Sequence, residues 1–169
     1  TLGGTPDLDG DGTPDVLVGL LAREGSVLAC SGRDGRTLWT MVNPSGPAGG
    51  SLHMYFGQAV STMPDLNGDG TPDVLVGSPA TYAGSLRGKV YLLSGRGGEM
   101  LGTVTAEMAG DGFGMSVCSA GPGIQGGSPA FLVGAPWHGD IGGFGPALVG
   151  KVYLYGETSA LPRQMATSD

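Results

Sequence analysis

The sequence predicts an all-β protein, and three observations support this fold class. Glycine and proline supply 35 and 12 of the 169 residues, and both are unfavourable inside helices. The hydrophobic fraction of 40% is too high for a disordered chain. Sequence repeats of about 58–62 residues recur along the chain. These features together predict just under three repeated units of short strands joined by tight turns.

The clearest repeat is an acidic segment followed by an apolar run. DLDGDGTPDVLVG at Asp7–Gly19 returns as DLNGDGTPDVLVG at Asp65–Gly77, 58 residues later. Phe56–Met63 returns at Phe113–Ala120 with an offset of 57 residues. We therefore divide this single repeat region into units at about 1–51, 52–108 and 109–169.

Within the second unit the apolar runs have the length and composition of strands. Short runs rich in β-branched and aromatic residues, bounded by glycine or proline, are typical of strands. We expect strands at Phe56–Met63, Asp73–Gly77, Lys89–Ser94 and Glu99–Ala106, with Ser94–Gly98 as the turn of a hairpin. Four antiparallel strands in a repeated unit describe the blade of a β-propeller.

The two outer units are expected to be incomplete. The first unit begins at its acidic loop with no preceding strand. The third has strands at Phe113–Ala120, Phe131–Val133 and Val152–Tyr155, and the tail Glu157–Asp169 either supplies a fourth strand or does not. Three such blades do not close a ring by themselves. We therefore expect open strand edges, covered by further copies of the chain or by the remainder of a longer propeller. The segment Leu161–Asp169 is a candidate for strand addition to the next subunit.

The pattern D-x-[DN]-x-D-G-x-x-D occurs twice and predicts two metal-binding loops. The expected ligands are the side chains at positions 1, 3, 5 and 9 and the carbonyl at position 7: Asp7, Asp9, Asp11, Thr13 and Asp15 in the first loop, and Asp65, Asn67, Asp69, Thr71 and Asp73 in the second. Hard oxygen ligands in a wrapping loop suit Ca²⁺ better than Mg²⁺. The alternative is a metal-free turn rich in Asp and Asn, in which four neighbouring carboxylates would repel one another. Position 12 is Val18 or Val76, which excludes the EF-hand, because that loop needs a glutamate there.

These motifs together resemble the FG-GAP repeats of integrin α-subunit β-propellers and their bacterial relatives. In the second unit the matches are Phe56-Gly57, the acidic loop, Gly77-Ser78-Pro79 and Gly88-Lys89-Val90-Tyr91; in the third they are Phe113-Gly114, Gly134-Ala135-Pro136 and Gly150-Lys151-Val152-Tyr153. Two departures follow. The third unit has Pro122, Ile124, Gly126 and Ala130 at the ligand positions, so we expect no third ion. The first unit lacks the Phe-Gly pair and has Gly19-Leu20-Leu21 in place of Gly-x-Pro.

Other candidate residues give weaker signals. His53 and His138 stand in no recognised motif and are interpreted as loop residues. Cys30 and Cys118 are expected to be buried free thiols and not a disulfide. Trp39 is expected to be a packing residue.

Charge and hydropathy exclude some partners. The net charge of −7 disfavours nucleic acid, and the apolar run Val16–Ala22 is too short to enter and cross a membrane. The resemblance implies a non-enzymatic extracellular or cell-surface module for adhesion or for protein or glycan interaction. Two alternatives remain open. One is a self-assembling subunit of an extracellular fibre or oligomer, built by pairing of strand edges. The other is a fragment of a quinoprotein-like propeller enzyme, which Val27–Trp39 resembles.

Overall fold

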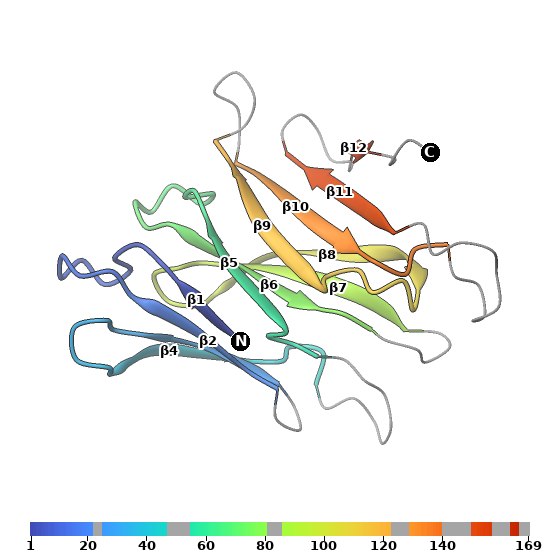
Figure 1. Ribbon diagram of the computed structural model, residues 1–169. Helices are drawn as coiled ribbons and strands as arrows, with labels where there is room; N and C mark the ends of the chain where they lie inside the picture. Colours follow the sequence, from blue (N-terminus) through green and yellow to red (C-terminus); the bar gives the residue numbers. More distant parts are fainter. Residues whose placement is uncertain are drawn as a thin grey trace.

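The computed structural model describes residues 1–21, 25–46, 55–80, 86–122, 129–139, 150–156 and 163–165. Throughout these ranges the chain forms strands, turns and loops, with no helix. The strands form three separate four-stranded antiparallel sheets (Figure 1). The predicted all-β class and the four-stranded units are therefore confirmed.

Each sheet takes its strands from consecutive segments of the chain. The first contains β1 (Leu2–Gly4), β2 (Val16–Leu20), β3 (Ser26–Cys30) and β4 (Thr37–Val42). The second contains β5 (Ala59–Met63), β6 (Asp73–Ser78), β7 (Arg87–Leu93) and β8 (Met100–Ala109). The third contains β9 (Ser116–Gly121), β10 (Ala130–Ala135), β11 (Lys151–Tyr155) and β12 (Arg163–Met165).

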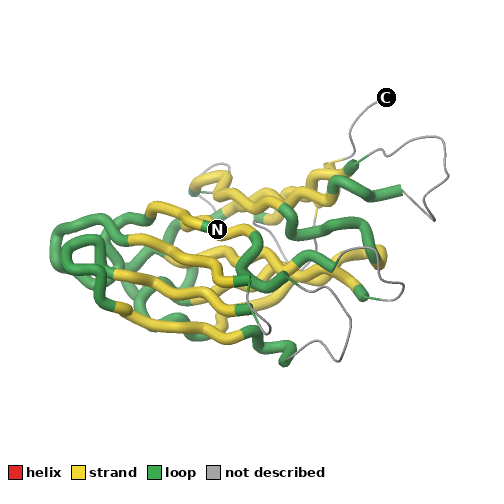
Figure 2. The backbone as a smooth tube through the Cα atoms, turned by 60° about the horizontal axis from the view of Figure 1, so that its bottom comes forward, coloured by secondary structure: helices red, strands yellow, loops and turns green. Residues whose placement is uncertain are grey.

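The three sheets are arranged as consecutive blades of a propeller. Within each sheet the strands lie side by side in chain order. The first strands of successive sheets contact one another, β1 with β5 and β5 with β9, so they lie on the inner side of the array. In Figures 1 and 2 the described strands form an open stack of sheets and not a closed ring.

The expectation that the first unit lacks its first strand is wrong. β1 pairs antiparallel with β2, from Leu2 opposite Val18 to Gly4 opposite Val16. This segment is short and glycine-rich, so its side chains carry little strand signal. The pairing depends on main-chain hydrogen bonds, for which glycine has the same groups as any other residue.

The C-terminal tail supplies the fourth strand of the third sheet. β12 pairs with β11 of the same chain, with Val152 opposite Met165 and Leu154 opposite Arg163. Arg163–Met165 therefore pairs within its own chain and not with another subunit, as the strand-addition hypothesis required. The argument for open edges from missing strands is thus wrong for both outer units.

Two apolar cores hold the blades together, one on each face of the second sheet. Val74, Val76 and Tyr91 pack against the first sheet, whereas Leu75 and Val90 pack against the third. Successive side chains of a strand point to opposite faces, so β6 and β7 contribute to both cores. This explains why all six residues of β6 are buried.

The Phe-Gly pair forms the contact between one blade and the next. Phe56 is fully buried, and its ring meets Tyr91 edge to face with the centroids 5.3 Å apart. Phe113 and Tyr153 repeat this arrangement at 5.1 Å. The aromatic residues of the Phe-Gly and Gly-x-Val-Tyr motifs of one unit therefore pack together in the core between its sheet and the preceding sheet.

The glycine of the same pair packs on the preceding blade. Gly57 has a φ of +88°, a conformation that residues with a Cβ rarely adopt. Its carbonyl lies so close to Gly19 of β2 that a Cβ on Gly19 would fall well inside 3.0 Å. Gly114 makes the same approach to Gly77 of β6. Glycine at the end of the second strand is thus required by close contact between backbones.

The remaining packing predictions have mixed outcomes. Cys30 and Cys118 are both free. Cys30 is only half-buried and Cys118 is exposed, so the expectation that both thiols are buried is wrong. They point to the outer faces of their sheets, away from the cores. Trp39 is buried, and its Nε1 donates a hydrogen bond to the Gly95 carbonyl at 2.7 Å, as expected for a packing residue.

Within the described part of the chain, no helix is long and apolar enough to cross a membrane.

Candidate metal centre

The two acidic loops lie at the same end of the molecule. Each connects the first strand of a sheet to the second, and both are on the left in Figure 1, beside the β3–β4 and β7–β8 hairpins. A cleft of about 600 Å³ separates them. Its lining includes Asp7 and Asp9 of the first loop, Asp69 of the second, and Arg36 and Arg96 of the hairpins.

Backbone N–H groups fold the first loop around the Asp7 carboxylate. Asp7 Oδ1 accepts a hydrogen bond from Gly10 N at 2.7 Å, and Oδ2 accepts one from Gly12 N at 2.7 Å. Both glycines have positive φ, 80° and 86°, which explains glycine at these positions. The N–H of Gly12 is the main cause that lowers the pKa of Asp7. This carboxylate is therefore held in its charged form.

The second loop repeats this arrangement. Asp65 accepts hydrogen bonds from Gly68 N at 2.6 Å and from Gly70 N at 2.7 Å. Asp69 Oδ1 accepts one from Thr71 N at 2.8 Å, as Asp11 Oδ1 does from Thr13 N at 2.8 Å in the first loop. The same residue spacing in the two loops thus produces matching backbone geometry.

The aspartate at position 9 of each loop is held by the neighbouring hairpin. Asp15 accepts hydrogen bonds from Leu8 N at 2.7 Å and Gly32 N at 3.0 Å. Asp73 accepts them from Leu66 N at 2.7 Å and Gly95 N at 3.2 Å. Sequence reasoning missed the two hairpin glycines, although the repeated Ser-Gly pairs at 31–32 and 94–95 were a signal for them.

Burial changes the ionisation of the position-9 carboxylate of the second loop, Asp73. Asp73 has no exposed surface, and burial raises its pKa above the ordinary value, with a smaller contribution from the charges of Asp65 and Asp69. The pKa of Asp69 is lowered, first by a hydrogen bond from the Asn67 side chain. A buried carboxylate beside other acids is stabilised by a nearby cation.

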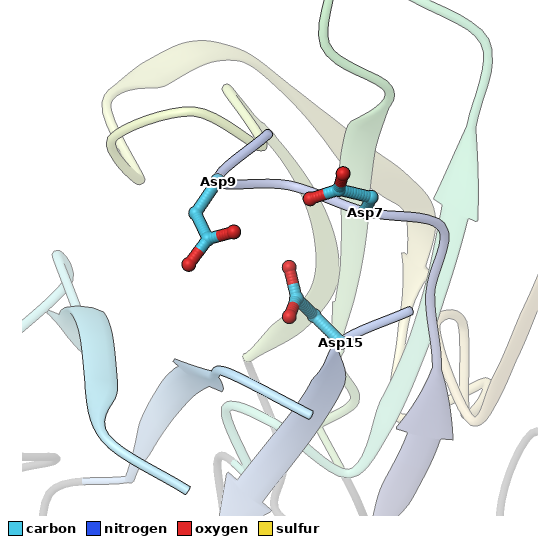
Figure 3. A group of neighbouring side chains, drawn as sticks. All are labelled: Asp7, Asp9 and Asp15. Atoms are coloured by element: carbon cyan, nitrogen blue, oxygen red, sulfur yellow. The ribbon is translucent and has the colours of Figure 1, made fainter. Parts of the chain in front are cut away.

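Three carboxylates of the first loop come together in space. Oxygens of Asp7, Asp9 and Asp15 lie within 4.8 Å of one another, and Figure 3 shows the three side chains converging on a common space. A set of carboxylate oxygens at this spacing fits a hard divalent cation. Asp11 is outside this group. In the second loop the residue equivalent to Asp9 is Asn67.

Of the other candidate residues, His138 is described, and its contacts lie away from the acidic loops. Most of the third unit's equivalent loop (123–128) and His53 lie outside the described residues. The absence of a third ion therefore stays a prediction. His138 lies at the boundary of the second and third sheets, with Nδ1 3.5 Å from the buried Asp111 Oδ2 and 3.4 Å from the Tyr153 hydroxyl. The hydroxyl of Tyr91 makes a similar contact with Ser45 between the first two sheets, at 2.7 Å. We therefore interpret these polar contacts as structural links between neighbouring sheets.

Comparisons with known proteins agree with these motifs. The profile of the FG-GAP repeat matches residues 56–93, which contain β5, the second acidic loop, β6 and β7. Human integrin alpha-7 (Homo sapiens) is 34% identical over 113 residues, covering 64% of this chain and 9% of that protein. Mouse integrin alpha-IIb (Mus musculus) is 32% identical over 150 residues, covering 76% of this chain and 14% of that protein. The chain thus spans only a small part of the length of these relatives.

A comparison of folds gives a more distant likeness. The rhamnogalacturonan lyase PL11 of Bacillus licheniformis has a TM-score of 0.50 and 15% sequence identity. The match covers 97% of this chain and 34% of the lyase. It supports the arrangement of sheets alone. The family profile, the integrin relatives and the Phe-Gly contacts between blades together establish that this chain belongs to the FG-GAP repeat family, of the integrin α-type β-propellers.

Proposed function

We propose that this chain is a non-enzymatic extracellular FG-GAP propeller module that binds two Ca²⁺ ions and functions in adhesion or in protein or glycan interaction. The observation that carries the calcium part is the repetition of one acidic loop with the same backbone hydrogen bonds around Asp7 and Asp65. Similarity to integrin α-chains supports the extracellular location and the adhesive role.

The donor set favours Ca²⁺ over the smaller Mg²⁺. In the first loop, Asp7, Asp9 and Asp15 would hold the ion, with Asp11 and the Thr13 carbonyl as further ligands. In the second, the ligands would be Asp65, Asn67, Asp69, Asp73 and the Thr71 carbonyl. Ca²⁺ accepts six to eight oxygens in an adaptable geometry, whereas Mg²⁺ requires near-octahedral coordination and keeps several waters. A bound ion supplies positive charge to the buried position-9 carboxylate and joins each loop to its hairpin.

Calcium titration and thermal unfolding test this proposal. Calorimetry should detect two sites, and a chelator should lower the melting temperature, because an ion that binds only the folded loop stabilises it by mass action. Asp69→Ala should remove one site. Glu107→Gln is the matched control, since Glu107 is an exposed acid of β8 that pairs with Lys151 of β11 and should leave both sites intact. Fewer than two sites in the wild type, or a melt that is unchanged by chelator, would contradict the proposal.

A surface observation favours a second candidate, assembly with further blades. On the outer face of the first sheet, Leu2, Leu20 and Val42 are 75%, 43% and 51% exposed. The strand register places them on the same face as Val18, opposite the core side. Val152 on the outer face of the third sheet is 42% exposed. Exposed apolar surface of this kind usually marks an interface.

We infer that this face packs against another blade, from a second copy or from the remainder of a longer chain. Light scattering of the native protein should then give a mass above 16.8 kDa. Val42→Lys should weaken assembly, because a charge would be buried without a partner. Thr103→Lys serves as the control, because Thr103 is an exposed residue of β8 in the second sheet. A monomer that stays soluble at high concentration would argue against assembly from copies.

A further inference from the structure

The two acidic loops differ in the contacts that they receive from the neighbouring hairpin: in the second loop Ser94 Oγ donates to Asp69 Oδ2 at 3.2 Å, and in the first loop an arginine contacts an aspartate. Arg36 Nη2 lies 2.5 Å from Asp9 Oδ2, and Asp9 belongs to the cluster with Asp7 and Asp15. Arg36 is therefore a cation of the chain itself, placed beside the carboxylates that would hold a metal ion.

The second unit has no arginine at this place. Ser31 N donates to the Arg36 carbonyl and Ser94 N donates to the Glu99 carbonyl, both at 2.8 Å, so Arg36 and Glu99 occupy equivalent positions in their hairpins. The side chain of Glu99 lies over its own turn, against Gly97. In the second unit, Asn67 thus stands in place of Asp9, and Glu99 stands in place of Arg36.

This difference equalises the charge around the two loops. The first loop has four aspartates, and its hairpin adds Arg33, Asp34 and Arg36, which brings the net charge to −3. The second loop has three aspartates, and in its hairpin the charges of Arg96 and Glu99 cancel, which also gives −3. In the second loop the neutral Asn67 side chain donates to Asp69 Oδ2 at 3.0 Å in place of a fourth carboxylate. The extra acid in the first loop is accompanied by its own counter-ion.

We propose that Arg36 determines the calcium affinity of the first loop by competing with the ion for Asp9; this inference rests on the proposed calcium binding. Without Ca²⁺, the guanidinium reduces repulsion among Asp7, Asp9 and Asp15. With Ca²⁺, Arg36 shares or leaves the Asp9 carboxylate. A second partner is within reach, since Arg36 Nε lies 3.6 Å from Asp34 Oδ2.

The surroundings allow this exchange of partners. The Arg36 side chain is 56% exposed, whereas that of Asp9 is only 13% exposed. The guanidinium also borders the cleft between the two loops, so it can move without displacing packed side chains. The first loop therefore depends less on the ion for its folded conformation than the second loop does.

Calcium binding to Arg36→Gln tests the inference. The variant is made in an Asp69→Ala background, so that the first loop is the remaining site. Its dissociation constant for Ca²⁺ should fall about three- to five-fold, the range that an exposed ion pair accounts for. Arg96→Gln in the same background is the matched control, because Arg96 borders the same cleft from the other hairpin, and it should leave the constant unchanged.

Thermal unfolding provides a second readout. In excess chelator, Arg36→Gln should lower the melting temperature relative to Arg96→Gln, and saturating Ca²⁺ should reduce the difference. If Arg36→Gln does not fold, the comparison is made in the second loop: Asn67→Asp with Glu99→Arg should bind Ca²⁺ more weakly than Asn67→Asp alone.

The outcomes separate this inference from the proposed function. If calcium binds both loops of the wild type but Arg36→Gln and Arg96→Gln have the same affinity at the first loop, the role of Arg36 is wrong and the calcium sites stand. If the wild type binds no calcium at the first loop, the proposed function itself fails there.

Discussion

Replacing Gly77 with alanine should destabilise the protein, although the same change is harmless in most strands. A Cβ on Gly77 would fall well inside 3.0 Å of the Gly114 carbonyl oxygen, which is backbone and not the end of a flexible side chain. The turn that contains Gly114 has a φ of +91° at this residue and is anchored by the buried Phe113. This turn cannot move away from Gly77 without disturbing the core between the second and third sheets.

The magnitude follows from two opposing effects. Alanine restricts the unfolded chain and by itself stabilises by about 0.4–1 kcal/mol. Inserting a methyl group into close-packed backbone costs about 1–3 kcal/mol. Gly102 of β8 is the matched control, because a Cβ there would meet only Leu92 Cδ1, at 3.9 Å. The effect on the unfolded chain is common to both variants, so the free energies of unfolding of Gly77→Ala and Gly102→Ala should differ by the packing cost, about 1–3 kcal/mol.

Urea denaturation at saturating Ca²⁺, followed by tryptophan fluorescence, measures this difference. Equal stabilities for the two variants, within about 0.5 kcal/mol of each other, would refute the account of why glycine follows the apolar run of β6. A large loss in both variants would instead mean that Gly102 lies in tighter packing than the structure describes.

Three further predictions concern the cores. Trp39→Phe should lower the free energy of unfolding by about 1–2 kcal/mol, because the buried Gly95 carbonyl loses its donor at 2.7 Å; urea titration checks this. Phe113→Ala should cost about 3–5 kcal/mol, since it empties a fully buried position beside Tyr153, whereas Phe113→Leu should cost less. Burial raises the pKa of Tyr155 to about 12, so the folded state keeps a proton that the unfolded state loses near pH 10. Stability should therefore fall as pH rises from about 10 to about 12, and melts at several alkaline pH values with a Tyr155→Phe control would show whether this residue is responsible.

The strands β5 to β11 of the second and third units could be predicted because each is marked by its side chains, whereas the sequence left β12 open. Expected Asp73–Gly77 became β6 at Asp73–Ser78, and expected Val152–Tyr155 became β11 at Lys151–Tyr155. Apolar β-branched runs between glycines and prolines define such strands without tertiary information. β1 carried no such signal, because two of its three residues are glycine and it is held by backbone pairing with β2.

The sequence predicted the ligands of the candidate site, but not the hairpin residues that hold these ligands in place. The acidic residues follow one another within nine positions, so the pattern itself locates them. Their supports lie farther along the chain: Gly32 donates to Asp15 across 17 residues, and Arg36 reaches Asp9 across 27 residues. Contacts at such separations depend on how the hairpin folds back over the loop, which the local pattern does not contain.

The burial of β6 on both faces has a consequence for how the protein opens. In an array of units that contact only their neighbours, the end units can detach singly, whereas the central one cannot leave without breaking two contacts. The first and third sheets each share one core with the second. Amide hydrogens of β6 and β7 should therefore exchange with solvent only through opening of the whole array, and those of β2 and β10 through cheaper, separate openings. Hydrogen exchange should therefore be slowest in the second sheet and faster in the first and third sheets on either side of it.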